Sequence, residues 1–130
     1  MELKDKELSS KVINAAIKVH QNVGVGFLES IYEKALCIEL DSACISYEQQ
    51  KSVQLNYQGK PIGEHRLDLL VEGRLVVELK STKHLEPIHF ATVRSYLKAA
   101  NLESGLLLNF AAIPLDIKRV GRELPSYFSR

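Results

Sequence analysis

The sequence has 130 residues, of which 45% are hydrophobic and 25% are charged, a balance typical of one soluble domain with one core. No apolar run reaches the roughly 18–20 residues of a membrane-spanning helix, and the charged start MELKDKELSS lacks the apolar stretch of a secretory signal. We therefore expect a single cytoplasmic domain over residues 1–130 without a membrane partner. The net charge of +1 argues against a strongly basic nucleic-acid coat, although it leaves a local binding site open.

The first predicted element is a helix that begins at Ser9 or Ser10, which offer N-caps to an apolar pattern with helical spacing. This helix should end near Asn22, because Gly24 follows and glycine tolerates the left-handed exit of a helix. The two cysteines further along, Cys37 and Cys44, are expected to be free thiols in a reducing compartment.

A second helix is predicted from Phe27 or Leu28 to about Ala43. Its apolar residues recur at intervals of three and four, which indicates one buried stripe along the helix. The stripe comprises Leu28, Ile31, Tyr32, Ala35, Leu36 and Leu40.

From residue 46 onward the pattern changes from helical spacing to alternation. Residues 52–58 predict a half-buried strand, and the glycines and proline of Gly59–Gly63 predict a turn. Residues 65–71 and 74–80 then flank Glu72–Gly73, which is the strongest hairpin signal in the chain. The apolar positions expected on the covered face of the first strand are Val53, Leu55 and Tyr57.

Pro87 is suited to the first turn of a third helix that runs to about Ala100. The apolar run of residues 104–110 predicts a central strand that is buried on both faces. Residues 117–124 are compatible with either a short edge strand or a turn of helix. The order of these elements, α-α-β-β-β-α-β, predicts an α/β domain with one mixed sheet and a crossover through the third helix.

The segment that carries chemistry is LDLLVEGRLVVELKS, residues 67–81. Asp68 and Glu78 lie in strands that are otherwise apolar, and burying an acid there is unfavourable unless it is paired or bound to a metal. Two converging carboxylates suit a hard divalent cation and leave coordination positions for water and a phosphate oxygen. Lys80 should point to the same face as Glu78, because side chains alternate along a strand.

The length of the hairpin loop decides whether the two acids meet. A three-residue loop pairs Val71 with Leu75 and brings Asp68 opposite Glu78. A two-residue loop would instead turn Glu78 to the other face, so a metal site predicts an odd loop or a bulge at this turn. The competing interpretation is a surface hairpin on which Glu78 and Lys80 are solvated, although the strand Leu-Val-Val-Glu-Leu is very apolar for such a hairpin.

These residues resemble the PD-(D/E)xK, or restriction-endonuclease-like, nuclease superfamily. Within that superfamily the chain is similar to the small GxxExxY proteins, whose signature reads GFLESIY at residues 26–32. The similarity continues through the segments YEKAL, LDLLV, VVELK, SYLKAA and GLLLNF, so it covers nearly the whole chain. It implies an αβββαβ core with a mixed central sheet flanked by helices.

The resemblance also implies Mg²⁺- or Mn²⁺-dependent phosphodiester hydrolysis of nucleic acid, with DNA the favoured substrate. Asp68 and Glu78 would be metal ligands, and the Leu79 carbonyl would be a further ligand. Lys80 would orient the attacking water or stabilise charge on the phosphate. Glu29 matches the early acid of the superfamily, which reaches the metal directly or through water; equally, it could simply complement a helix N-terminus.

Two residues depart from the superfamily pattern. Leu67 stands where a proline usually precedes the aspartate, and Thr92 stands where related sequences often have a glutamine four residues before Tyr96. Threonine is too short to hold a phosphate as a glutamine amide does. The alternative function is therefore a nuclease-fold module that cleaves little and binds nucleic acid or a protein.

Several other residues are weaker candidates for substrate contact. Thr92, Tyr96 and Arg94 lie on the third helix, where Arg94 and Lys98 could form a small basic patch, although the usual interpretation is a solvated face. The densest basic cluster in the sequence comprises Lys118, Arg119 and Arg122, and it could be a DNA-contacting edge or a plain surface. A small domain with one site must dimerise or act on single strands to make double-strand breaks, so a homodimer is a candidate state.

Overall fold

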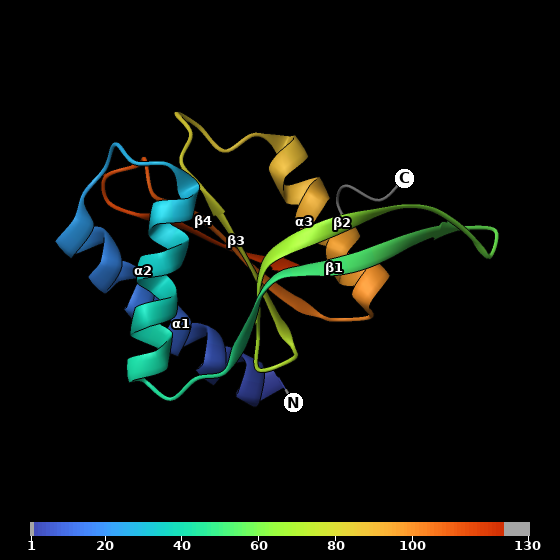
Figure 1. The fold of residues 1–130 in the computed structure, drawn as a ribbon, viewed down its shortest axis with the longest axis horizontal. Helices are drawn as coiled ribbons and strands as arrows, with labels where there is room; N and C mark the ends of the chain where they lie inside the picture. Colours follow the sequence, from blue (N-terminus) through green and yellow to red (C-terminus); the bar gives the residue numbers. More distant parts are fainter. Residues whose placement is uncertain (1, 124–130) are drawn as a thin grey trace.

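The computed structural model describes residues 2–123, with side chains from residue 5 (Figure 1). The bounds of the helices and strands are α1 Glu2–Val23, α2 Glu29–Ser42, β1 Tyr47–Tyr57, β2 Lys60–Val71, β3 Leu75–Lys80, α3 Pro87–Ala100, β4 Ser104–Asn109 and β5 Asp116–Gly121. The elements α2 to β4 follow the αβββαβ order that the resemblance implies. One helix, α1, precedes this core and one strand, β5, follows it.

The strands form one mixed sheet in the order β1-β2-β3-β4-β5. All neighbours are antiparallel except β3 and β4, which are parallel and joined by the crossover helix α3. This confirms the predicted α/β class and the restriction-endonuclease-like core, which runs from α2 to β4. In the part of the chain that the structure describes, no helix is long and apolar enough to cross a lipid bilayer.

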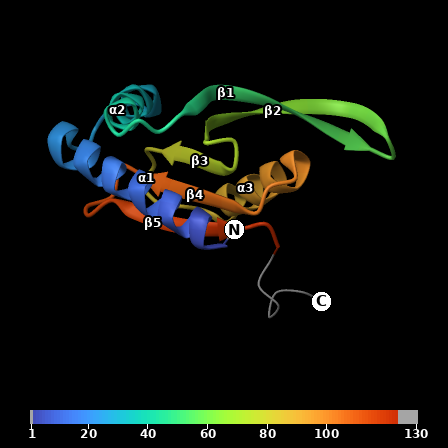
Figure 2. The ribbon, with the colours of Figure 1, turned by 90° about the horizontal axis from the view of Figure 1, so that it is seen from below.

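Two hydrophobic clusters cover the two faces of this sheet. One cluster packs α1 and α2 against β3 and β4, and the other packs α3 against the opposite face (Figures 1 and 2). In β4, Leu106 and Leu108 belong to the first cluster and Leu107 to the second, and all three are fully buried. The prediction of a central strand with two buried faces is therefore confirmed.

The start of α1 differs from the sequence prediction. The helix begins at Glu2, so Ser9 and Ser10 lie inside it and are not its N-caps. Ser9 is buried, and its hydroxyl donates to the Lys6 carbonyl. The charged residues that precede Ser9 include good helix formers, and Leu8 anchors that turn in the core, so the helix extends past the apparent cap.

The hairpin of β1 and β2 is also longer than predicted. Its turn lies at Gln58–Gly59, and residues 60–63, which were predicted to be turn, belong to β2. The far end of this hairpin projects beyond α3 (Figures 1 and 2), which leaves Tyr57 64% exposed. Tyr57 therefore does not share a covered face with Val53, because no helix of residues 2–123 packs over the end of this hairpin.

The remaining differences concern element ends and exposure. Helix α2 begins at Glu29, and two positions of its predicted buried stripe, Leu28 and Ile31, are exposed by 77% and 44%. Residues Asp116–Gly121 form an edge strand, which decides between the two interpretations of this segment, while residue 124 lies outside the described residues. Cys37 and Cys44 are both free, as predicted.

Candidate functional site

The β2–β3 hairpin has the loop length that brings the two acids together. Val71 pairs with Leu75 and Leu69 pairs with Val77, so the loop holds the three residues 72–74. The three-residue loop is confirmed, and the two-residue register is wrong. The turn has positive φ at two positions, 54° at Glu72 and 69° at Gly73, and a glycine meets the second requirement without strain.

Asp68 and Glu78 lie side by side just past the end of this ladder. The Asp68 amide donates to Oε1 of Glu78 at 3.0 Å, and the Leu79 amide donates to Oδ2 of Asp68 at 2.9 Å. Each carboxylate thus accepts a backbone hydrogen bond from the other strand, in place of the regular ladder. The two carboxylates therefore hold the strands together at the point where regular pairing ends.

Strand β2 changes its exposure pattern at Asp68. Leu67 packs in the cluster under α3, while Leu69 packs in the cluster under α1 and α2. Residues two apart in a regular strand share one face, so the strand must twist sharply between these leucines. Opposite this point, Gln50 of β1 has a positive φ of 52°.

Burial dominates the electrostatics of the acid pair. Glu78 is 5% exposed, and burial together with the neighbouring Asp68 charge raises the pKa of Glu78 to about 8. Burial also raises the pKa of the half-buried Asp68, although the bond from the Leu79 amide and the charge of Lys80 act in the opposite direction. Ionisation of the two carboxyl groups is therefore unfavourable, and a bound cation would stabilise their ionised forms.

Lys80 lies near both acids without forming an ion pair. Its charge lowers the pKa of Asp68 and of Glu78. Within residues 5–123, however, its ammonium makes no salt bridge within 4.0 Å. Residues 75–79 are all buried, so the alternative of a solvated surface hairpin is wrong.

Glu33 is an acid of the site that the sequence analysis missed. It is 9% exposed on α2, and its charge raises the pKa of both Asp68 and Glu78. Two side-chain amides, those of Gln49 and Gln50, donate to its carboxylate, each at 3.0 Å. The available signal was its spacing of four residues from Glu29, which puts both acids on one side of the helix.

Glu29 is the first residue of α2 and reaches the end of β3. Its Oε2 accepts a hydrogen bond from the Ser81 amide at 3.2 Å, and Ser81 directly follows Lys80. The Ser81 hydroxyl in turn donates to the Phe27 carbonyl at 2.8 Å. Glu29 therefore lies beside the strand end that carries Lys80, and it also stands at a helix N-terminus.

The third helix brings Tyr96 toward the acids. Tyr96 is 6% exposed, and burial together with the charges of Glu78 and Asp68 raises the pKa of its hydroxyl to about 12. That hydroxyl lies 3.4 Å from Nδ1 of His65, a residue of β2 that the sequence analysis did not single out. No local pattern in the sequence indicates this contact, because the two residues are 31 positions apart.

The other two candidates on α3 differ from Tyr96 in their surroundings. Thr92 is half-buried, and its hydroxyl donates to the Ile88 carbonyl at 2.8 Å, so it is occupied within the helix. Arg94 is also half-buried, but it is two residues from Tyr96, or roughly 200° around the helix. Arg94 and Tyr96 therefore point in different directions.

The donor set available for a metal is the Asp68–Glu78 pair. Among the side chains described, no group of three histidines, cysteines or acids lies close enough together to hold a metal ion. Two carboxylates and open positions for water and a phosphate oxygen nevertheless fit a hard divalent cation. The buried Glu78, which lacks an ion-pair partner among the described residues, fits the same interpretation.

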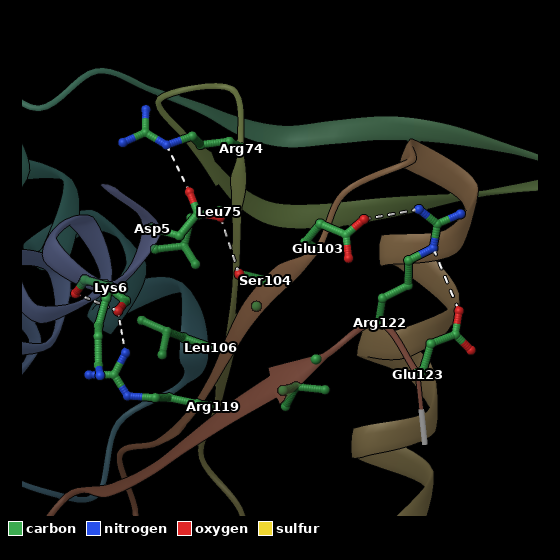
Figure 3. A pocket seen from close by; sticks show the side chains of 14 residues that line it. Asp5, Lys6, Arg74, Leu75, Glu103, Ser104, Leu106, Arg119, Arg122 and Glu123 are labelled. Atoms are coloured by element: carbon green, nitrogen blue, oxygen red, sulfur yellow. Dashed lines mark hydrogen bonds and ion pairs between the residues drawn. The ribbon is translucent and has the colours of Figure 1, made fainter. Parts of the chain in front are cut away.

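A separate open cavity of about 1150 Å³ lies at the other end of β3 and β4, and its lining includes neither Asp68 nor Glu78 (Figure 3). Two of its arginines are paired with acids. Arg74 binds Asp5 at 2.9 Å, and Arg122 binds Glu103 at 3.4 Å. In the predicted basic cluster, Lys118 lies 3.4 Å from Asp116, whereas Arg119 donates to the neutral hydroxyl of Ser9.

Comparisons with known proteins agree with this architecture. A family model described as the PD-(D/E)XK nuclease superfamily matches residues 6–120. Among solved structures, the chain is similar to the crystal structure of SSO0001, with a TM-score of 0.58 and 18% identity, over 76% of this chain and 52% of that chain. The chain thus spans about half the length of SSO0001, and the likeness shows the fold alone. No curated protein matches the chain.

Proposed function

Because the chain belongs to the PD-(D/E)XK nuclease superfamily, we propose that it hydrolyses phosphodiester bonds of nucleic acid, with DNA as the favoured substrate. The observation that carries this proposal is the reciprocal bonding of Asp68 and Glu78 at the end of the hairpin. Glu78 accepts the bond from the Asp68 amide through one of its two oxygens, and each oxygen of Asp68 that accepts one bond keeps a second lone pair for a ligand. Proteins of this superfamily generally use divalent metals, and Mg²⁺ or Mn²⁺ is the cation proposed here.

Asp68 and Glu78 would hold the cation through their carboxylates, and the carbonyl of Leu79 would add a third oxygen. The bound cation supplies a Lewis acid for the phosphate and lowers the pKa of a coordinated water. The two acids need no rearrangement for this, since backbone amides already fix their orientation. Such preorganisation is what makes electrostatic stabilisation effective.

Lys80 would act on the water and the phosphate. Its ammonium is near both carboxylates but free of a salt bridge within the described residues, so it can donate to a third group. We assign it the orientation of the attacking water or the stabilisation of negative charge on the phosphate. Glu29 of α2, whose Oε2 accepts from the Ser81 amide just past the end of β3, would contribute to the metal through a water molecule.

The substrate would reach this site past α3. Tyr96 would form part of the site wall beside the acids, and Thr92 and Arg94, which points to another side of α3, would lie along the path of the phosphate backbone. The hydroxyl of Thr92 is already satisfied by its own helix. Its contribution to phosphate binding would therefore be small.

The internal hydrogen bond of Thr92 favours the alternative function, in which the protein binds nucleic acid or a protein partner and cleaves little. The missing glutamine amide weakens substrate positioning without touching the metal ligands. This alternative thus differs from the first proposal in turnover and not in cation binding.

Within the superfamily we assign the chain to the GxxExxY group, on the strength of the signature at residues 26–32. We also propose that residues 1–130 form a single domain, because both hydrophobic clusters share one sheet. A reducing, cytoplasmic location suits the free thiols of Cys37 and Cys44. A homodimer would be needed only for cleavage of both strands of a duplex.

A cleavage assay tests the proposed activity. The wild-type protein is incubated with single-stranded, double-stranded and branched DNA and with RNA, in Mg²⁺, in Mn²⁺ and in a chelator. Lys80→Ala should abolish any cleavage, while Lys83→Ala, an exposed lysine three residues later, should retain it. Cleavage that survives the chelator or the Lys80→Ala change would refute the proposed chemistry, and binding without cleavage would support the alternative.

A further inference from the structure

Gln50 is the irregular residue of β1, directly beside the acid pair. Its φ of 52° is left-handed, although the residues on both sides of it pair normally, Gln49 with Leu69 and Lys51 with Leu67. A residue other than glycine adopts this conformation inside a strand only where surrounding contacts impose it.

The contacts of its side chain supply that cause. Adjacent residues in a strand normally point to opposite faces, yet the amides of Gln49 and Gln50 both donate to the carboxylate of Glu33, at 3.0 Å each. The left-handed backbone at Gln50 accounts for this arrangement. The same nitrogen of Gln50 also lies 3.4 Å from Oδ1 of Asp68.

A primary amide nitrogen carries two hydrogens, so Gln50 can serve both carboxylates at once. Glu33, which is buried and bound by a second amide, anchors one end of this bridge. Asp68 is then held on both oxygens, Oδ1 by Gln50 and Oδ2 by the Leu79 amide. The bridge also separates two negative charges that would otherwise repel each other.

We propose that Gln50 is a positioning residue, which holds the Asp68 carboxylate in the orientation that binds the cation. This inference rests on the proposed function. Hydrogen-bonded partners behind a metal ligand fix its direction, and their loss typically weakens metal binding by about 10- to 100-fold. Gln49 bonds only to Glu33 among these acids and should not have this effect.

Two variants separate positioning from folding. Gln50→Gly removes the amide but suits the left-handed backbone, so the fold should be retained. Gln49→Ala is the matched control, because it removes the other side-chain amide that donates to the Glu33 carboxylate. Urea unfolding should give both variants midpoints close to that of the wild-type protein.

The first readout needs no metal. The Leu79 amide donates to Asp68, so its hydrogen exchange, followed by NMR, reports whether that carboxylate stays in place. Exchange at Leu79 should become about tenfold faster in Gln50→Gly and stay unchanged in Gln49→Ala, with the amide of the buried Val77 as reference. Unchanged exchange at Leu79 in Gln50→Gly would overturn the proposal.

The second readout is calorimetric titration with Mn²⁺. The dissociation constant should rise about tenfold in Gln50→Gly and remain that of the wild type in Gln49→Ala. If the wild type and Gln50→Gly bind Mn²⁺ equally well, Gln50 is not a positioning residue, while the proposed function stands. If the wild type binds no Mn²⁺, the proposed function itself is refuted, and the role of Gln50 in cation binding falls with it.

Discussion

The amide of Asp68 donates to the Glu78 carboxylate at 3.0 Å, across the hairpin that carries both acids. Glu78 therefore combines a structural bond with a buried carboxyl group whose ionised form no salt bridge within residues 5–123 would compensate. These two properties have opposite effects on folding. The bond favours the folded protein, whereas ionisation of Glu78 opposes it.

The first prediction concerns the stability of Glu78→Gln as pH changes. An unfolded glutamate titrates near pH 4.5 and the folded Glu78 near pH 8, so between these values the folded protein keeps a proton that the unfolded chain has lost. The wild-type free energy of unfolding should therefore fall with rising pH across this window, by up to about 1.4 kcal/mol per unit for this group. Glutamine keeps the acceptor for the Asp68 amide and cannot ionise.

Urea unfolding at a series of pH values checks this. Glu78→Gln should match the wild type near pH 4 and be more stable than it at pH 8. The exposed Glu7→Gln provides the control, for which the two curves should run parallel. A Glu78→Gln protein that is less stable than the wild type at pH 8 would contradict the assigned burial.

The second prediction is that Mn²⁺ binds more tightly as pH rises toward 8. Metal binding requires the ionised carboxylate, and the pKa of Glu78 is raised to about 8 by burial and by Asp68. Below that value each ion bound must displace a proton, so affinity should fall by up to about tenfold per pH unit. Calorimetry in two buffers of different ionisation enthalpy would detect the released proton. A Mn²⁺ binding constant that does not change between pH 6 and 8 would contradict this prediction.

The third prediction distinguishes the two roles open to Glu29. If Glu29 reaches the metal through water, Glu29→Gln should weaken Mn²⁺ binding several-fold, in addition to the loss of its favourable interaction with the N-terminus of α2. If Glu29 only complements the N-terminus of α2, the change should cost about 0.3–1 kcal/mol of stability and leave affinity intact. We expect the first result. The Ser81 amide can still bond to the glutamine oxygen, so this contact does not confound the comparison.

The loop of the hairpin shows what the sequence could determine. Side chains alternate along a strand, so a site in which Asp68 meets Glu78 predicts an odd loop or a bulge, and the hairpin has a loop of three residues. The central strand at residues 104–110 could also be predicted, because a strand covered on both faces has an uninterrupted apolar run. These predictions succeeded where local patterning and tertiary packing agree.

Gln50 shows what the sequence could not determine. Its left-handed backbone arises from contacts with Glu33, which lies 17 residues earlier on another element. No local pattern encodes a glutamine that departs from strand geometry to reach a helix. Ser9 illustrates the same limit, since packing of α1 overrides an apparent capping signal.

The fourth prediction tests the packing that supports the site from the side of α3. A Cβ added to Gly105 of β4 would lie 2.8 Å from Cγ1 of Val93, which is fully buried. Gly105→Ala should therefore destabilise the protein by about 1–3 kcal/mol through overpacking. Gly121→Ala is the matched control, because a Cβ there would meet nothing within 4 Å. Denaturant unfolding measures the free energy of unfolding of both variants. Equal values for the two would contradict tight packing of α3 against Gly105.

The measurement that tests the central claim most directly is a calorimetric titration of the wild type, Asp68→Asn and Glu78→Gln with Mn²⁺ at pH 8. Both substitutions preserve shape and an oxygen acceptor but remove one negative charge from the pair. The wild type should bind Mn²⁺, and each variant should lose at least tenfold in affinity while remaining folded. Undiminished binding by both variants would place the cation elsewhere and contradict the assignment of Asp68 and Glu78 as its ligands.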